Sequence, residues 1–265
     1  MTTRSAMRQL TDIAYPALVF IVSIVVWEFG ARAGWFPPYV LPAPSSIVAR
    51  IGDTADLMLH HAVVTSFEII LGFVLAVIIG VALAAMIVFV RTIDKAFYPW
   101  LVVVQVIPKV ALGPLLVVWL GFGFLPKVLL AFLLSFFPVM ISAMVGLRSI
   151  DNDSMFLLRS MGADPIKIFR HLQLPSALPG IFGSMKVAIT LATVGAIVGE
   201  FIGANEGLGY VLVTANGVLD TTLIFVALTW ISVLALVFYG AIAMLENMSV
   251  HWHVSHRSRA AQALA

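Results

Sequence analysis

The chain contains no cysteine among its 265 residues, and charged residues make up only 11% of it. The missing cysteine excludes a disulfide framework, a cysteine-based zinc site and thiol catalysis, and it leaves the compartment open. Soluble domains carry about 25% charged residues, so the scarcity of charge is a large departure. The basic residues are scattered and the net charge is only +2, so the sequence shows no basic patch of the kind that binds nucleic acid.

Motifs for catalysis are missing as well. None of the five lysines follows a glycine, so the chain has no Gly-Lys-Ser/Thr phosphate loop. It also has no His-Glu-x-x-His and no Gly-x-Ser-x-Gly sequence. We therefore predict that the chain is not an enzyme and holds no cofactor. His251, His253 and His256 lie close together without acidic neighbours, which favours a solvated tail over a metal site.

Apolar residues are abundant, at 62% of the chain with a mean hydropathy of +1.08, so lipid must be the solvent for much of the surface. A spanning helix needs about 20 mainly apolar residues, and the apolar runs show none of the alternation of barrel strands. We predict an all-α membrane protein with a single domain over residues 1–265. Its six transmembrane helices are expected at residues 14–31, 63–90, 98–120, 128–147, 180–203 and 223–245.

The N-terminus has some features of a cleaved signal peptide. Arg4 and Arg8 precede the first apolar run, and Ala31 to Ala33 loosely resembles a small-residue cleavage site. However, the run is long enough to span a membrane and further spans follow, so we expect it to be retained.

The distribution of lysine and arginine predicts the orientation, because basic residues gather on the cytoplasmic side. With a cytoplasmic N-terminus, three basic residues fall in outer loops (Arg32, Arg50 and Lys127) and two within spans (Lys109 and Lys186). The other ten fall inside: Arg4, Arg8, Arg91, Lys95, Arg148, Arg159, Lys167, Arg170, Arg257 and Arg259. Both termini are therefore predicted to be cytoplasmic.

The largest predicted cytoplasmic segment, residues 151–175, has the start and stop signals of two short helices. Asp151 begins a run of N-cap candidates, and Gly162 is a natural left-handed stop. Asp164 and Pro165 then restart a helix, which we expect Pro175 to end. Such a helix–glycine–helix elbow suits docking into a groove on another protein, and equally suits an amphipathic hairpin lying on the inner leaflet.

Lys109 is expected near the middle of the third span, directly after Pro108. Charged groups inside a membrane are costly and are functional candidates by default. Gln105 lies one turn away on the same face, and the nearby prolines and glycines free backbone carbonyls that must face protein or water. We predict that Gln105, Pro108 and Lys109 border a solute pathway. The alternative is that Lys109 only caps freed carbonyls or pairs with a carboxylate.

Glu200 belongs to a stripe of small residues in the fifth span, and such stripes let helices approach closely. We therefore expect Glu200 to face the bundle, either lining the outer end of the pathway or locking two helices together. The stripe runs through Ala188, Ala192, Ala196 and Ala204, beside a second row at Gly195, Gly199 and Gly203. Glu28 and Glu68 are expected near the outer ends of their spans, with ordinary interfacial solvation.

The elbow resembles a known family. Gly162-Ala163, Ile168-Phe169 and the run from Leu174-Pro175 to Leu178-Pro179 resemble the "EAA" loop of binding-protein-dependent ABC importer permeases. In the family pattern a Glu-Ala-Ala triplet precedes the glycine. Phe156-Leu157-Leu158 occupies that place here, so the acidic residue is missing while the turn at Gly162 is kept.

Four further segments are similar to the nitrate/sulfonate/taurine branch of these permeases, so that the resemblance covers about Trp27 to Asn247. They are Ile107–Leu115 in the third span, Gly199–Phe201 in the fifth span, Glu206–Tyr210 in the outer loop that follows, and Pro37–Pro44 in the first outer loop.

The resemblance implies a type I (MetI-like) permease in a bacterial inner membrane. It implies two permease copies, expected to be identical, a cytoplasmic ATPase dimer that binds ATP and magnesium, and an extracytoplasmic solute-binding protein. Movement would be alternating access. The elbow would couple to the ATPase through Phe156, Leu157, Leu158, Met161, Gly162, Ala163, Asp164, Pro165, Ile168, Phe169, Leu174 and Pro175.

The solute expected from the resemblance is a small organic anion such as a sulfonate, taurine or nitrate, which Lys109 would suit. The alternative is a heteroaromatic vitamin precursor such as hydroxymethylpyrimidine. A different class, an ion-coupled secondary transporter, would show inverted repeats with matching broken helices, and only the third span has a Pro/Gly interruption. A membrane scaffold would need neither the intramembrane charges nor the elbow.

Overall fold

The computed structural model describes residues 3–90, 96, 101 and 103–250, and regular structure in these residues is entirely helical. The first part of the chain forms α1 (Thr3–Arg32), α2 (Pro44–Asp53) and α3 (Ala55–Phe89). The 3₁₀ turn η1 (Lys109–Leu112), α5 (Gly113–Leu120) and α6 (Phe124–Arg148) follow. The rest comprises α7 (Asn152–Ser160), α8 (Pro165–Ile168), the π turn η2 (Phe169–Gln173), α9 (Leu174–Gly203), α10 (Leu208–Gly217) and α11 (Thr221–Ser249).

Five helical stretches are long and apolar enough to cross a membrane. They are Ala14–Arg32, Ala55–Phe89, Phe124–Arg148, Pro165–Gly203 and Thr221–Ser249. Five of the six predicted spans fall on these helices, most of which are longer than the predicted spans. The predicted third span, 98–120, lies partly outside the described residues, and within it Lys109–Leu120 is a shorter apolar helix.

The core is built on α6, which packs between α3 and α9. Small residues bring these helices together, because a Cβ on Gly195 of α9 would stand 2.6 Å from the Cα of Ala131 on α6. A Cβ on Gly72 of α3 would stand 2.6 Å from the Cβ of the same alanine. The predicted stripe on α9 is confirmed, since Ala188, Ala192 and Ala196 are fully buried. Close approach of this kind is typical of helix packing in membranes.

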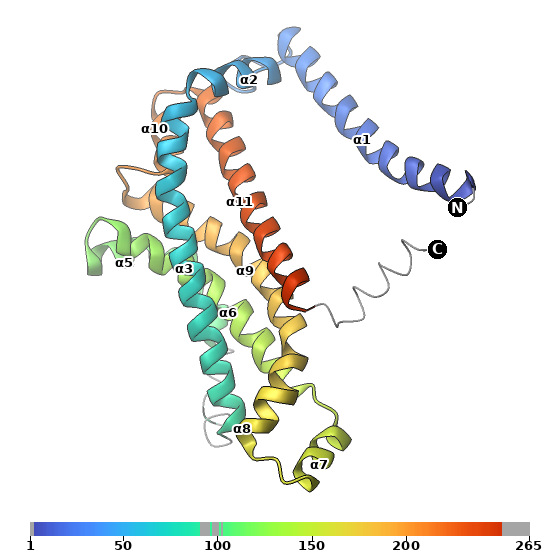
Figure 1. Cartoon of the computed structure of the whole chain (residues 1–265). Helices are drawn as coiled ribbons and strands as arrows, with labels where there is room; N and C mark the ends of the chain where they lie inside the picture. Colours follow the sequence, from blue (N-terminus) through green and yellow to red (C-terminus); the bar gives the residue numbers. More distant parts are fainter. Residues whose placement is uncertain (1–2, 91–95, 97–100, 102, 251–265) are drawn as a thin grey trace.

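Two spanning helices are left largely uncovered by the rest of the chain. Only 6% of the most apolar stretch of α1 and 11% of that of α11 is buried, against 61% for α6. Figure 1 shows α1 running out and away from the bundle, joined to it through α2. Such apolar surfaces are stable only against lipid or another protein.

The bundle has two distinct ends in Figure 1. The end that carries α2 and α10 is called here the α2 end, and the opposite end, which carries α7 and α8, is called the elbow end. The helix α10 lies in a segment predicted only as an outer loop between the fifth and sixth spans. Its sequence is too short for a span and begins at glycines, so hydropathy gave no sign of it.

Pro175 does not end a helix, contrary to the prediction. Helical structure continues without a break from α8 through η2 into α9, so that residues 165–203 form one continuous helical stretch. Pro175 lies in the first turn of α9, directly after the π turn. Pro175 removes one backbone N–H from this stretch, and the π turn directly before it accommodates the irregularity.

Candidate functional site

The turn between α7 and α8 is fixed by local hydrogen bonds. Gly162 has a φ of +77°, in the left-handed region, as predicted. Its N–H donates to the carbonyl of Arg159 at 3.0 Å, and the N–H of Ala163 donates to the carbonyl of Leu158 at 3.0 Å. This pair of bonds is a Schellman motif, which satisfies the last carbonyls of α7.

The second arm of the elbow is also capped as predicted. The Asp164 carboxylate accepts a hydrogen bond from the N–H of Lys167 at 2.7 Å, and Pro165 occupies the first helical position. Both features pre-organise the start of a helix. The elbow is therefore a rigid turn with both of its helix ends satisfied.

The predicted coupling residues divide into an outer and an inner set. Phe156, Leu157 and Met161 are 66%, 62% and 74% exposed, which is unusual for side chains of this size. Gly162, Asp164 and Pro165 are also exposed, whereas Leu158, Ala163, Phe169, Leu174 and Pro175 are half-buried. Ile168 is buried at 6% exposure, and the Phe169 ring lies 5.1 Å from that of Phe89 on α3. The outer set forms a free apolar surface, and the inner set ties the elbow to the core.

Lys109 has two partners within the chain. Its Nζ donates to the Gln105 carbonyl at 2.9 Å and lies 4.6 Å from the centroid of the Phe137 ring on α6. A lysine over an aromatic face is attracted by the ring electrons. Lys109 therefore caps a carbonyl freed just before Pro108, as the alternative reading foresaw. Gln105 and Pro108 are exposed and Lys109 is half-buried.

Glu200 is in the packed interior, at 2% exposure, where it holds the start of α10. Its Oε1 accepts a hydrogen bond from the Thr65 hydroxyl on α3 at 2.7 Å, and its Oε2 accepts one from the N–H of Gly209 at 2.5 Å. A carboxylate suits a helix N-terminus, where N–H groups lack partners and the dipole is positive. That Glu200 faces the bundle is confirmed, and that it contacts solute stays a prediction.

Helix α3 supplies two more acceptors to the same helix end. The N–H of Leu208 donates to Thr65 Oγ1 at 2.8 Å, and the N–H of Gly207 donates to His61 Nδ1 at 3.0 Å. Thr65 and His61 are both buried. The N-terminus of α10 is thus tied to α3 and α9 through side chains that lie far apart in sequence.

A buried ion pair lies beside this cap. Lys127 on α6 pairs with Glu68 on α3, and their side chains are 8% and 0% exposed. Glu68 also interacts electrostatically with Glu200. The predictions that Lys127 lies in an outer loop and that Glu68 is solvated at the interface are therefore wrong. Helix α6 begins at Phe124, so Lys127 lies in its first turn. The Lys127 backbone packs closely on α9, since a Cβ added to Gly199 would stand 2.9 Å from the Lys127 Cα. The ion pair of Lys127 and Glu68 therefore lies inside the bundle.

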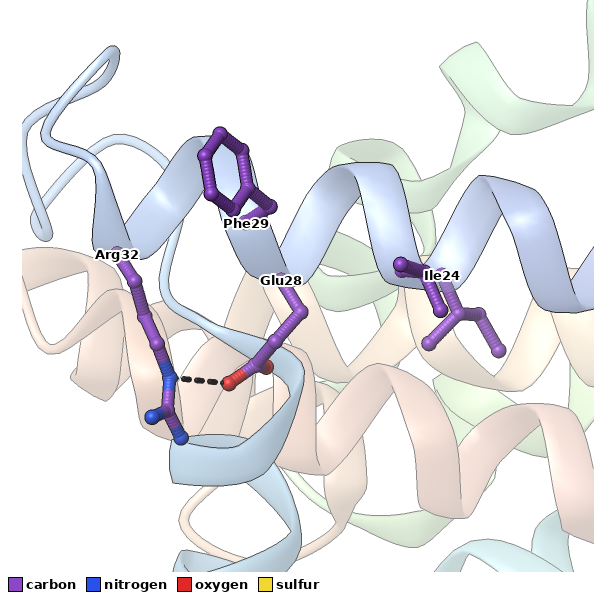
Figure 2. Close-up of a pocket in the computed structure, with 5 residues that line it drawn as sticks. Ile24, Glu28, Phe29 and Arg32 are labelled. Atoms are coloured by element: carbon purple, nitrogen blue, oxygen red, sulfur yellow. Dashed lines mark hydrogen bonds and ion pairs between the residues drawn. The ribbon is translucent and has the colours of Figure 1, made fainter.

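The corner between α1 and α2 is held by a surface network, of which Figure 2 shows the Glu28–Arg32 pair. Arg32 Nε donates to Glu28 Oε1 at 2.5 Å, and the N–H of Ser45, in the first turn of α2, donates to Glu28 Oε2 at 3.0 Å. Arg32 also donates to the Ser45 hydroxyl at 3.0 Å. Glu28 is partly exposed and fixes how α1 leaves α2, a role that hydropathy did not indicate.

A further ion pair joins Lys186 on α9 to Glu246 on α11. In the part of the chain that the structure describes, no group of three or more histidine, aspartate or glutamate side chains is arranged to hold a metal ion. His251, His253 and His256 lie outside the described residues.

The chain combines a helical membrane bundle with an apolar elbow at one end. Residues 72–249 match the family of binding-protein-dependent transport system inner membrane components, and the chain belongs to this family. It is the non-catalytic permease subunit of an ABC importer and a multi-pass inner-membrane protein. A binding-protein-dependent importer implies an ATPase and a solute-binding protein as partners.

Three relatives show which proteins the chain is similar to. It is 36% identical to the formylaminopyrimidine transport permease protein ThiX of Halalkalibacterium halodurans, over 89% of this chain and 95% of the relative. It is 34% identical to the riboflavin transport system permease protein RibX of Chloroflexus aurantiacus, over 94% and 95%. Identity falls to 27%, over 90% and 91%, for the putative aliphatic sulfonates transport permease protein SsuC of Escherichia coli.

The fold also matches a solved structure. An inward-facing crystal structure of the MetNI methionine ABC transporter superposes with a TM-score of 0.64 at 18% identity, over 73% of this chain and 96% of that one. The chain therefore has the MetI-like permease fold.

Proposed function

We propose that this chain forms the pathway of an importer for a heteroaromatic vitamin precursor and couples to its ATPase through the elbow. The observation that carries the coupling role is the apolar surface of Phe156, Leu157 and Met161, held outward by the Schellman turn. Large apolar side chains on a helix in water favour a groove on a partner.

The inner set of elbow residues connects the docking surface to the spanning helices. Ile168 is buried, and Phe169 packs on Phe89 at the end of α3. Because α8 continues into α9 without a break, a displacement of the elbow would move α9 as a unit. Closure of the ATPase dimer would then rock the spans and alternate the access of the pathway.

We propose that the elbow end is cytoplasmic and that the α2 end faces outward. Ten of the fifteen basic residues fall on the cytoplasmic side in this orientation, in agreement with the positive-inside tendency. The single domain would assemble as two identical copies. The uncovered faces of α1 and α11 offer surface for a partner copy or for lipid.

The pathway is proposed to run beside Gln105, Pro108 and Lys109. Gln105 and Pro108 are exposed, so this broken segment presents polar backbone beyond the packed core. Irregular backbone at membrane depth is stable only against protein or a water-lined cavity. Glu200 would serve this pathway indirectly, by holding α10 and α9 in register.

The solute is proposed to be heteroaromatic and not a small organic anion. The relatives named for formylaminopyrimidine and riboflavin are 36% and 34% identical, against 27% for the sulfonate permease. The lysine that would suit an anion, Lys109, already bonds to a carbonyl and an aromatic ring. The anion expectation therefore loses its main structural support.

The coupling role is tested by purifying the tagged permease with its ATPase in mild detergent. The double variant Phe156→Ser/Leu157→Ser should lose the ATPase while remaining inserted and folded. A matched control is Val218→Ser/Leu219→Ser at the α2 end, where both side chains are similarly exposed at 76% and 70%. Retention of the ATPase by the elbow variant would contradict the proposed role.

A further inference from the structure

A cavity of about 380 Å³ lies at the α2 end, between α3, the α5–α6 turn and the segment after α9. Its lining includes Val64, Glu68, Phe122, Phe124, Lys127 and Asn205. It is separate from Lys109 and from the elbow, so neither feature of the proposed mechanism uses it. A volume of this size accommodates a single small ring.

The walls of the cavity are aromatic. Phe122 and Phe124 flank Gly123 in the turn before α6, and all three line the space. Phe122 packs on Gly203 at the end of α9, where a Cβ would stand 2.5 Å from its Cδ1 atom. Both rings remain exposed, at 79% and 45%, so their faces are available for contact. Aromatic side chains with open faces favour stacking on a flat ring.

The polar lining of the cavity combines the buried ion pair of Glu68 and Lys127 with Asn205 and Glu206. Lys127 pairs with Glu68 Oε1, while no N–H of the described residues donates to the fully buried Glu68 Oε2, and the Glu200 carboxyl group lies close to Glu68. Buried polar atoms in folded proteins are nearly always hydrogen-bonded, so an unused acceptor calls for an explanation. This acceptor lies beside an ammonium group, which gives the site an acceptor and a donor side by side.

The local charge disfavours an anion. The carboxyl groups of Glu68 and Glu200 interact here, Glu206 also lines the cavity, and the Lys127 ammonium pairs with Glu68. A sulfonate or nitrate carries only acceptors, so it offers these carboxyl groups no hydrogen-bond donor.

We propose that this cavity is a solute subsite that recognises the amino edge of an aminopyrimidine ring. The amino group would donate to Glu68 Oε2, the neighbouring ring nitrogen would accept from Lys127 Nζ, and the ring would rest on Phe122 and Phe124. An aminopyrimidine presents a donor next to an acceptor, which complements the acceptor and donor of the ion pair. This inference rests on the proposed heteroaromatic solute and assigns the residues that select it.

The test is a binding measurement on the purified permease–ATPase complex in nanodiscs, without the binding protein. The probes are radiolabelled 4-amino-2-methylpyrimidine and 2-methylpyrimidine, which lacks the amino group. We expect the amino group to strengthen binding to the wild type about tenfold, corresponding to one charge-assisted hydrogen bond. In Glu68→Gln, whose amide oxygen still accepts but carries no charge, the advantage of the amino probe should shrink to about threefold or less.

A merely structural role for Glu68 predicts a different pattern. The variant would then weaken both probes equally or change neither, and either result would overturn the inference. Phe124→Leu supplies a second variant that leaves the ion pair intact. It should weaken both probes about threefold to tenfold if the ring stacks here, and unchanged binding would count against the site.

The inference and the proposed function fail in different ways. If the complete importer takes up the aminopyrimidine but the permease–ATPase complex does not bind it, the subsite is wrong and the function stands. If the complete importer does not take up this solute, the proposed function is wrong, and the subsite falls with it.

Discussion

The two ends of the bundle use opposite chemistry. At the elbow end, Phe156, Leu157 and Met161 point outward, and the backbone around Gly162 satisfies its own hydrogen bonds. At the α2 end, Glu68, Lys127 and Glu200 are buried, and backbone groups of α10 depend on side chains from α3 and α9. The elbow end exposes large apolar side chains, which are usually buried, and the α2 end buries charged side chains, which are usually exposed.

Under the proposed function, the elbow end would meet the ATPase, and the α2 end would set an internal arrangement of the helices. The elbow turn satisfies its backbone through its own hydrogen bonds, so its apolar surface would be pre-formed for the proposed docking. Buried charges are costly unless each finds its partner, so the α2 end is stable in only a few arrangements of α3, α6 and α9. In the proposed orientation, such a cluster would hold the outer side of the pathway in one arrangement.

The largest effect is expected from breaking the buried ion pair. Lys127→Met leaves the Glu68 carboxylate buried without its cation, which should lower the free energy of unfolding by about 3–5 kcal/mol. The double variant Glu68→Leu/Lys127→Leu removes both charges and should recover most of that loss. Thermal unfolding in detergent measures both, and a single variant as stable as the wild type would mean that the pair is not formed.

A smaller effect is expected at the cap of α10. Glu200→Ala removes the acceptor for Thr65 and for the N–H of Gly209, and should cost about 2–3 kcal/mol because hydrogen bonds to a charged group are lost in the interior. Glu200→Gln keeps an oxygen acceptor and should cost less. Proteolysis at the segment 204–220 gives the readout, since loss of the cap should expose it.

The smallest effect on stability, with the largest effect on coupling, is expected at the elbow. Gly162→Val forces a β-branched residue into the left-handed region, at a cost of about 1–2 kcal/mol. The protein should still insert, but ATP hydrolysis should no longer drive transport. Gly162→Asn, which tolerates this conformation, and Gly183→Val, where a Cβ meets open space, are the matched controls. Normal transport by Gly162→Val would show that the turn at Gly162 is not needed to couple ATP hydrolysis to transport.

Much of the fold is predictable from local sequence because hydropathy and capping act over short distances. The spans, the turn at Gly162, the cap at Asp164 and the small-residue stripe on α9 all have signals of this kind. The resemblance to importer permeases was confirmed, whereas the expected organic anion is supported less well than its heteroaromatic alternative.

The buried cluster at the α2 end had no such signal. Glu68 and Lys127 are far apart in sequence, and their pairing depends on how α3 packs on α6. Each looks alone like a charge at the end of a span, where solvation is the ordinary expectation. Pro175 misled for a related reason, because the π turn that accommodates it is a product of packing and not of a local motif.

The most direct test of the account is uptake into proteoliposomes that contain the permease, its ATPase and its binding protein. We predict that radiolabelled 4-amino-2-methylpyrimidine enters only with ATP and binding protein, and that excess taurine does not compete. Uptake of taurine in its place would contradict the proposed solute. Uptake of the pyrimidine driven by an ion gradient, without ATP, would contradict the coupling mechanism.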